Sequence, residues 1–407
     1  MFKTYEINQG IRLHYLRDSK FKTNTIAVFI RTKLSAENAT KTALVVECIK
    51  GGCSKHVTKR DIALALEDMY GSVFDVSVIK RGDEQIIYTY FEGIRGYDVF
   101  EKGTEFLGDM LYSPIINGNA LKKARKSLTD SIEAVRDDKG EYAVERMTAE
   151  MCGPKENFGV PTLGFSKEVD GIDEDGLTKY YHHLITCAPI DIFIVGDGED
   201  EMVKSRIQGI FSQARCNIED VIHSEYIGST DKPKVFNEHD QVNQGKLCMC
   251  YSTGLKVEKD SLLALMVLNE IIGGGASGRL FLEVREKEGL CYSIGSFVFK
   301  HKMLLVVQAG IDKKAYDKVV GLIENTINEI KKEIDEKSVE DGKKNIIKAY
   351  ESVGDTPVDR INFGFSMELL GFEFDPTEFI EEIKKVTIQQ VADSAKALKS
   401  EIIYFLR

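Results

Sequence analysis

The sequence has 407 residues, of which 43% are hydrophobic and 29% charged, and its formal net charge is −11. At ~100–200 residues per domain this length predicts two or three domains, and the apolar fraction excludes a wholly disordered chain. The acidic balance argues against non-specific binding to nucleic acid or anionic membranes, because such binding needs clustered lysines and arginines.

The compartment is predicted from targeting signals and cysteines. Residues Met1–Gly10 do not resemble a signal peptide, and no stretch approaches the ~20 continuous apolar residues of a membrane span. The eight cysteines are scattered, mostly beside apolar residues, and form no CxxC pair. This pattern is typical of reduced, buried thiols, so we expect a soluble, cytoplasmic protein.

The first half of the chain shows an alternation of strand and helix patterns. In chain order we expect a strand at 25–32, a helix over 43–49 ending at Gly51 and Gly52, a hairpin at 74–78 and 85–92, helices over 97–111 and 120–137, a strand at 190–195 and a helix over 200–212. The glycines after the first helix predict a left-handed C-terminal cap.

The second half repeats much of this order. We expect a strand at 246–253, a helix over 261–272 that ends at Gly273, a hairpin at 292–298 and 303–309, helices over 313–332 and 339–352, and a strand at 401–406. A left-handed glycine cap is expected after this first helix too. Internal repeats of this length indicate two similar structural units.

The fold class predicted from these patterns is α+β. Each half should form a mainly antiparallel sheet covered by helices on one face, because hairpins alternate with long helices. The polar segment Ser224–His239 is the predicted linker. The predicted domains are therefore residues 1–228 and 229–407.

The segment Gly273–Gly278 (GGGASG) satisfies the literal pattern GxGxxG. A dinucleotide fingerprint must follow a strand and open a helix, whereas here a helix precedes and a hairpin follows. A phosphate-binding loop is also excluded, since Arg279 and Leu280 stand where lysine and serine or threonine are needed. What remains is a flexible loop that lets a peptide approach closely.

Arg285 and Tyr292 lie seven residues apart, with Gly289 between them. A guanidinium and a phenol brought together could hold a peptide carbonyl and stabilise an oxyanion. The alternative interpretation is an arginine on a helix surface and a tyrosine on a strand face, and spacing alone favours that alternative.

The longer segment Gly273–Ser296 (GGGASGRLFLEVREKEGLCYSIGS) resembles the C-terminal signature of the insulinase/pitrilysin (M16) peptidase family. The family pattern GGG-x-x-SRLF-x-E-x-R-E-x-x-G-L-x-Y-S is matched throughout, except that Gly278 replaces the serine before Arg279. The resemblance implies two α+β domains that clamp a partner around a peptide-holding chamber. It also implies that Arg285 and Tyr292 bind substrate and that Gly273, Gly274 and Gly275 form a mobile loop beside the peptide.

Active members of this family carry a zinc motif, H-x-x-E-H, in the first half, because two histidines and a downstream glutamate leave one position open for water. Aligned on the following glycines, the motif falls on Leu44–Cys48. Leu44 and Cys48 replace the histidines and Glu47 remains, while the downstream glutamate falls near Ser131, with Glu133 close by.

The seven histidines do not rebuild this site, since no two have i, i+4 spacing. We therefore predict no metal and no cofactor in this chain, and we assign Glu47 no catalytic role. Cys248 and Cys250 share one face of a strand, where core packing explains them more simply than metal binding does.

By this resemblance the chain is similar to the YmfF-like bacterial branch and to zinc-less subunits of the mitochondrial-processing-peptidase type. It would be inactive alone and would serve a zinc-bearing partner of similar length in peptide cleavage. The alternative is a non-enzymatic peptide-binding or scaffolding protein, possibly homodimeric. A third interpretation is an enzyme that uses Glu47 and Cys48 with another metal.

Overall fold

A computed structural model describes residues 1–221, 223–226, 228 and 232–407. The chain divides into two compact units that are not continuous in sequence. The first unit comprises Met1–Ala134, Val160–Ile222 and Gly354–Ser366, and the second comprises Val135–Gly159, His223–Val353 and Met367–Arg407. The predicted boundary falls between residues 228 and 229, and residue 229 lies outside the described residues. The domain ranges 1–228 and 229–407 therefore stay a prediction.

The first unit contains a six-stranded sheet in the order β1-β2-β6-β3-β5-β4. Its strands are β1 (Lys3–Asn8), β2 (Ile11–Arg17), β3 (Thr23–Lys33), β4 (Val73–Arg81), β5 (Glu84–Ile94) and β6 (Ile190–Gly196). Only the β2–β6 pair is parallel among these described strands, so the sheet is mainly antiparallel as predicted. Strands β1 and β2 were not expected from the sequence patterns.

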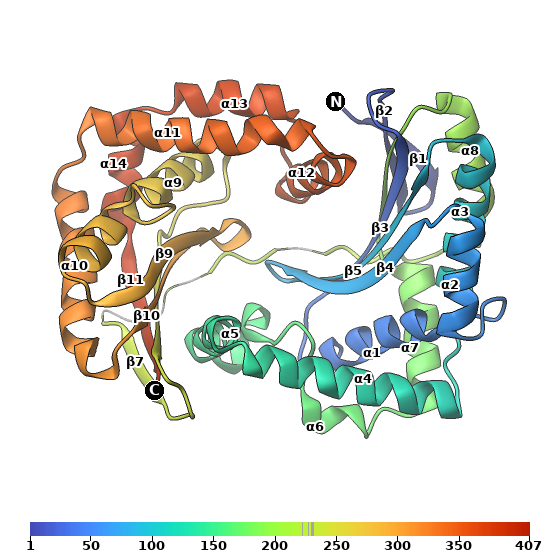
Figure 1. Cartoon of the computed structure of the whole chain (residues 1–407), viewed down its shortest axis with the longest axis horizontal. Coiled ribbons are helices and arrows are strands. Elements are labelled where there is room, and N and C mark those ends of the chain that lie inside the picture. The colour runs from blue at the N-terminus through green and yellow to red at the C-terminus, as the bar shows by residue number, and fades with distance from the viewer. Residues whose placement is uncertain (222, 227, 229–231) are drawn as a thin grey trace. The chain divides into compact units, whose positions relative to one another are not determined.

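Helices cover one face of this sheet. They are α1 (Ala39–Gly51), α2 (Lys59–Asp68), α3 (Tyr97–Tyr112), α4 (Gly118–Asp137), α6 (Ser166–Val169), α7 (Glu174–Cys187) and α8 (Asp200–Ile210). Alternate strand residues such as Val28 and Ile30 point into the shared hydrophobic core, as the period of a strand requires. Figure 1 shows α3 and α8 side by side on this face.

The opposite face of the same sheet carries aromatic and charged side chains. Phe29 stacks on Phe365, with ring centroids 3.6 Å apart, so the segment Gly354–Ser366 packs on this face. Arg31 pairs with the fully buried Glu84 at 2.7 Å and with Asp191 at 3.2 Å. Removing one partner of such a buried pair would leave an uncompensated buried charge, so replacing any one of these residues should strongly destabilise the first unit.

The second unit contains a five-stranded sheet in the order β7-β11-β8-β10-β9. Its strands are β7 (Lys234–Glu238), β8 (Gly245–Ser252), β9 (Cys291–Phe299), β10 (Leu304–Ile311) and β11 (Lys399–Leu406). The prediction that Ser224–His239 is only a linker is wrong for its C-terminal part, because β7 pairs in parallel with β11. A short strand on a sheet edge needs little hydrophobic patterning, which explains why composition did not show it.

Helices cover both faces of the second sheet, whereas one covered face was expected. One side carries α9 (Lys259–Ile272), α10 (Tyr316–Lys332), α11 (Glu336–Glu351), α13 (Pro376–Lys385) and α14 (Ile388–Ala397). The other side packs on α5 (Lys139–Cys152), which contacts β8 and β11 (Figure 1). Ala143 and Met147 of α5 join Cys248 and Cys250 in one core. The remaining helix, α12 (Pro357–Leu370), has residues in both units.

The two predicted glycine caps differ from expectation. Gly52 follows α1 with φ 141° and ψ 172°, and Gly273 follows α9 with φ −171°, so neither has the left-handed conformation. At Gly52 a Cβ atom would lie 2.6 Å from the carbonyl oxygen of His56. Glycine is therefore required there by a close backbone approach as well as by its positive φ.

All eight cysteines are free thiols, and only Cys216 is exposed. Six of them are buried, where a thiol packs as a small apolar side chain. No helix in the described part of the chain is both long enough and apolar enough to cross a membrane.

Candidate functional site

The first candidate position is the helix face where the family's zinc ligands would lie. Leu44 and Cys48 sit one turn apart on α1, and their exposed fractions are 0% and 1%. Burial, with a further contribution from neighbouring Glu47, raises the pKa of the Cys48 thiol to about 12. A leucine cannot coordinate a metal, and a thiol with this pKa stays protonated at neutral pH. The place of both histidines is therefore filled by core packing.

Glu47, the surviving motif residue, has both carboxylate oxygens engaged. One oxygen accepts from Lys50 Nζ at 3.0 Å, and the other accepts from Ser127 Oγ at 2.5 Å. Ser127 lies on α4, so Glu47 links the two helices. This contact was not predicted. The expected position, Ser131, lies one turn further along α4 and is half-buried, while Glu133 is exposed.

The side chains at the motif position, Leu44, Glu47 and Cys48, do not fit a zinc ion. A catalytic zinc site needs three protein ligands, usually histidines and a carboxylate, around an open position. No group of three or more histidine, cysteine, aspartate or glutamate side chains within the described ranges could hold a metal ion. The geometry at Glu47 indicates a structural link between α1 and α4.

The second candidate position is the pair Arg285 and Tyr292. Arg285 belongs to a π-helical turn, Phe281–Lys287, and its guanidinium lies over the Phe281 ring, 4.8 Å from the centroid. Tyr292 is the second residue of β9 and is 77% exposed. No hydrogen bond joins the two side chains in the described part of the chain. Both are free to contact another molecule, although their role in binding substrate stays a prediction.

The glycine loop after α9 is closely packed. Gly273 accepts a backbone hydrogen bond from Ser296 at 2.8 Å, and Gly278 donates one to Gly275 at 3.0 Å. A Cβ atom on Gly278 would lie 2.7 Å from Gly273 Cα, closer than real Cβ contacts allow. The glycine that departs from the family pattern is therefore required by the way this loop folds on itself.

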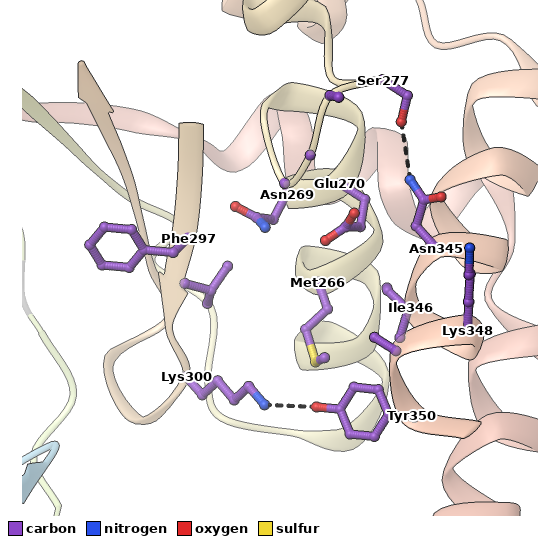
Figure 2. A pocket seen from close by; sticks show the side chains of 15 residues that line it. Met266, Asn269, Glu270, Ser277, Phe297, Lys300, Asn345, Ile346, Lys348 and Tyr350 are labelled. Carbon is purple, nitrogen blue, oxygen red and sulfur yellow. Dashed lines mark hydrogen bonds between the residues drawn. The ribbon is translucent and has the colours of Figure 1, made fainter. Parts of the chain in front are cut away.

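A cavity of about 900 Å³ lies beside this loop in the second unit, between α9, β9 and α11. Figure 2 shows Asn269 and Glu270 on α9 pointing into it, with Ser277 at one end and the Lys300–Tyr350 pair at the other. Met266 and Phe297 supply apolar surface. The sequence analysis did not predict this cavity.

The polar groups of the cavity are partly satisfied. Lys300 Nζ donates to Tyr350 Oη at 3.1 Å, and Asn345 Nδ2 donates to Ser277 Oγ at 3.1 Å. Burial raises the pKa of Glu270 above its ordinary value. The Oδ1 atom of Asn269 is buried without a hydrogen-bond partner. An unsatisfied buried acceptor is costly, so a ligand that donates to Asn269 would be stabilised here.

The cavity and the filled metal position occupy corresponding places in the two halves. Glu270 stands three residues before Gly273, as Cys48 stands three residues before Gly51. By the same count Asn269 corresponds to Glu47 and Met266 to Leu44. The repeat register was the sequence signal that could have located the cavity.

Comparison with known proteins gives a consistent result. Residues 171–346 match the family model described as Peptidase M16 inactive domain. The chain is 26% identical over 410 residues to the "Probable inactive metalloprotease YmfF" of Bacillus subtilis, and the alignment covers 98% of this chain and 96% of that protein.

Solved structures share the fold. A conserved protein from Enterococcus faecalis gives a TM-score of 0.91 at 24% identity and covers 100% of this chain and 98% of its own. A peptidase M16 inactive domain from Pseudomonas fluorescens gives 0.83 at 16% identity, with coverage of 100% and 98%. The family resemblance and the two-unit α+β fold predicted from the sequence are confirmed.

Proposed function

Since the chain is an inactive M16-family peptidase homologue, we propose that it is the zinc-less subunit of a two-subunit peptidase. In this proposal a zinc-bearing chain of similar length supplies the metal and the general base. This chain supplies Arg285 and Tyr292 to the bound peptide. In this proposal the subunit works in the cytoplasm, and its buried free thiols, which suit a reducing compartment, support that part of the proposal.

The observation that carries the proposal is an asymmetry between two sites. The metal position on α1 is filled by Leu44 and Cys48, which are fully buried. The side chains of Arg285 and Tyr292 remain exposed, and neither side chain has an ion-pair or hydrogen-bond partner within the described ranges. A chain that had lost all function would not be expected to keep exposed side chains of this kind beside a folded glycine loop.

The chemistry assigned to the pair is electrostatic. A guanidinium and a phenolic hydroxyl both donate hydrogen bonds and can stabilise the negative oxygen that develops when a peptide carbonyl is attacked. Removing one such donor typically lowers kcat by about 10²-fold or more. The effect requires that a partner complete the site, so this chain alone should cleave nothing.

Reconstitution with the zinc-bearing partner tests the proposal. The chain alone should bind no stoichiometric zinc and show no peptidase activity. In the reconstituted pair, Arg285→Ala and Tyr292→Phe should each lower kcat/KM by about 10²-fold. Lys287→Ala, on the same π-helical turn, and Tyr70→Phe, at a tyrosine that is 68% exposed, serve as matched controls. Unchanged kcat/KM in both test variants would refute the assignment.

The second candidate function is peptide binding without cleavage, possibly by a homodimer. The cavity beside the glycine loop favours it, because apolar side chains and an unpartnered acceptor there could hold a peptide segment without a metal. Purification from the native source separates the two. Recovery with a zinc-bearing relative supports the peptidase subunit, and homodimers that bind peptide without a second chain support the scaffold.

A further inference from the structure

A separate cavity of about 440 Å³ lies in the first unit, where β6 ends and helices α3 and α8 begin. It is distant in sequence from Arg285 and Tyr292 and has no place in the proposed function. The buried side chains of Phe100, Ile194 and Val203 give it largely apolar walls. This size suits one small organic molecule.

One buried amide in this cavity is without a partner. Asn24 is only 6% exposed and lines the cavity, yet no hydrogen bond to its side chain exists among the residues that the structure describes. A Cβ atom on Gly196 would collide with Asn24 Oδ1, so the glycine keeps this amide accessible. The polar atoms of this amide are reached from the cavity, so a polar ligand there can hydrogen-bond to it.

The rim of the cavity carries one positive and one negative group side by side. Arg95 Nε lies 3.2 Å from Asp197 Oδ2, and both side chains are about one-third exposed or more. Helix α3 begins just after Gly96, which has no side chain to cap it, so backbone N–H groups of the first turn lie beside Arg95, and the Asp98 carboxylate of that turn offsets part of their positive character. The other rim carboxylate, Glu199, is held by Arg17 at 2.7 Å.

We propose that this cavity binds a free α-amino acid with a hydrophobic side chain. The carboxylate pairs with Arg95 and the first turn of α3, and the ammonium group pairs with Asp197. The amide of Asn24 hydrogen-bonds to the same charged end, and the side chain packs on Phe100 and Ile194. A free amino acid carries an ammonium group and a carboxylate on one carbon, which matches the adjacent Asp197 and Arg95, whereas the carboxylates of the rim repel a multiply charged anion such as a phosphate.

Calorimetry and thermal unfolding of the full chain with L-leucine, L-methionine and L-phenylalanine test this proposal. Each should bind saturably and raise the melting temperature in a concentration-dependent way. L-Leucinamide and N-acetyl-L-leucine each lack one charge, and each should bind at least about tenfold more weakly than L-leucine. Absence of saturable binding of the three amino acids, or binding of either analogue as tight as that of L-leucine, would overturn the proposal.

Variants locate the site. Arg95→Gln should weaken L-leucine binding about tenfold or more and leave the weak binding of L-leucinamide unchanged, because the amide lacks the carboxylate. Arg17→Gln is the matched control, since Arg17 contacts Glu199 but does not line the cavity. Both arginines are partly exposed, so both variants should fold. The assignment would be contradicted if the two variants lost affinity for L-leucine equally, or if Arg95→Gln lost none.

Discussion

Restoring histidines to the metal position gives a demanding test of the packing at α1. The change Leu44→His, alone and with Cys48→His, recreates the two imidazoles of the family motif at positions that are 0% and 1% exposed. Losing a fully buried leucine removes about 2 kcal/mol of hydrophobic stabilisation. An imidazole nitrogen buried without a partner costs about 1–3 kcal/mol more.

Together these terms give a destabilisation of about 4 kcal/mol for Leu44→His, a large share of the ~5–15 kcal/mol that a typical protein has. Cys48→His adds the cost of overpacking, about 1–3 kcal/mol. Zinc should not restore stability in the double variant, because Ser131 stands near the place of the third ligand, the downstream glutamate, and Glu47 is already held by Lys50 and Ser127.

Urea denaturation with and without zinc, together with metal analysis, measures both expectations. Leu64→His is the matched control, because Leu64 on α2 is 49% exposed and its replacement should change stability by less than about 0.5 kcal/mol. The reasoning is refuted if Leu44→His is as stable as the control. It is also refuted if the double variant binds one zinc ion per chain and is stabilised by it.

Three further predictions concern stability and reactivity. Asp191→Asn should destabilise the chain by about 3–5 kcal/mol, because Asp191 is 1% exposed and pairs with Arg12, Arg31 and His14. Burial opposes ionisation of Asp191, but the His14 hydrogen bond and the two arginines outweigh burial and lower the pKa of Asp191. The contribution of ionised Asp191 to the free energy of unfolding is therefore present above pH ~4 and is lost as pH falls through the lowered pKa. Denaturation measured against pH should show that loss in the native chain and not in the variant. Gly278→Ala should cost about 1–3 kcal/mol, since its Cβ would meet Gly273, whereas Gly275→Ala meets nothing within 4 Å and should be nearly neutral; equal melting temperatures would show that the loop rearranges freely. Under native conditions a thiol reagent followed by peptide mass mapping should label exposed Cys216 well before Cys48, and rapid labelling of Cys48 would mean that α1 opens readily.

Much of the fold could be predicted from local patterns. The helix over 261–272 and the strand at 246–253 are found as α9 and β8, because strong hydrophobic periodicity reports which face is buried. Short or edge elements were missed for the opposite reason. β7 is a five-residue edge strand with one neighbour, so pairing with β11 decides it, and its own sequence does not.

The candidate site, like the fold, could be predicted from the sequence only in part. Because Leu44 cannot bind a metal, the sequence alone determined that the family's zinc motif is broken, and the order of elements revealed the repeat. Only the tertiary structure decided that Ser127 holds Glu47, and that an open cavity lies at the corresponding place in the other half. Side-chain identity fixes which chemistry is possible, but whether a carboxylate is held or a cavity left open depends on packing between helices far apart in the chain.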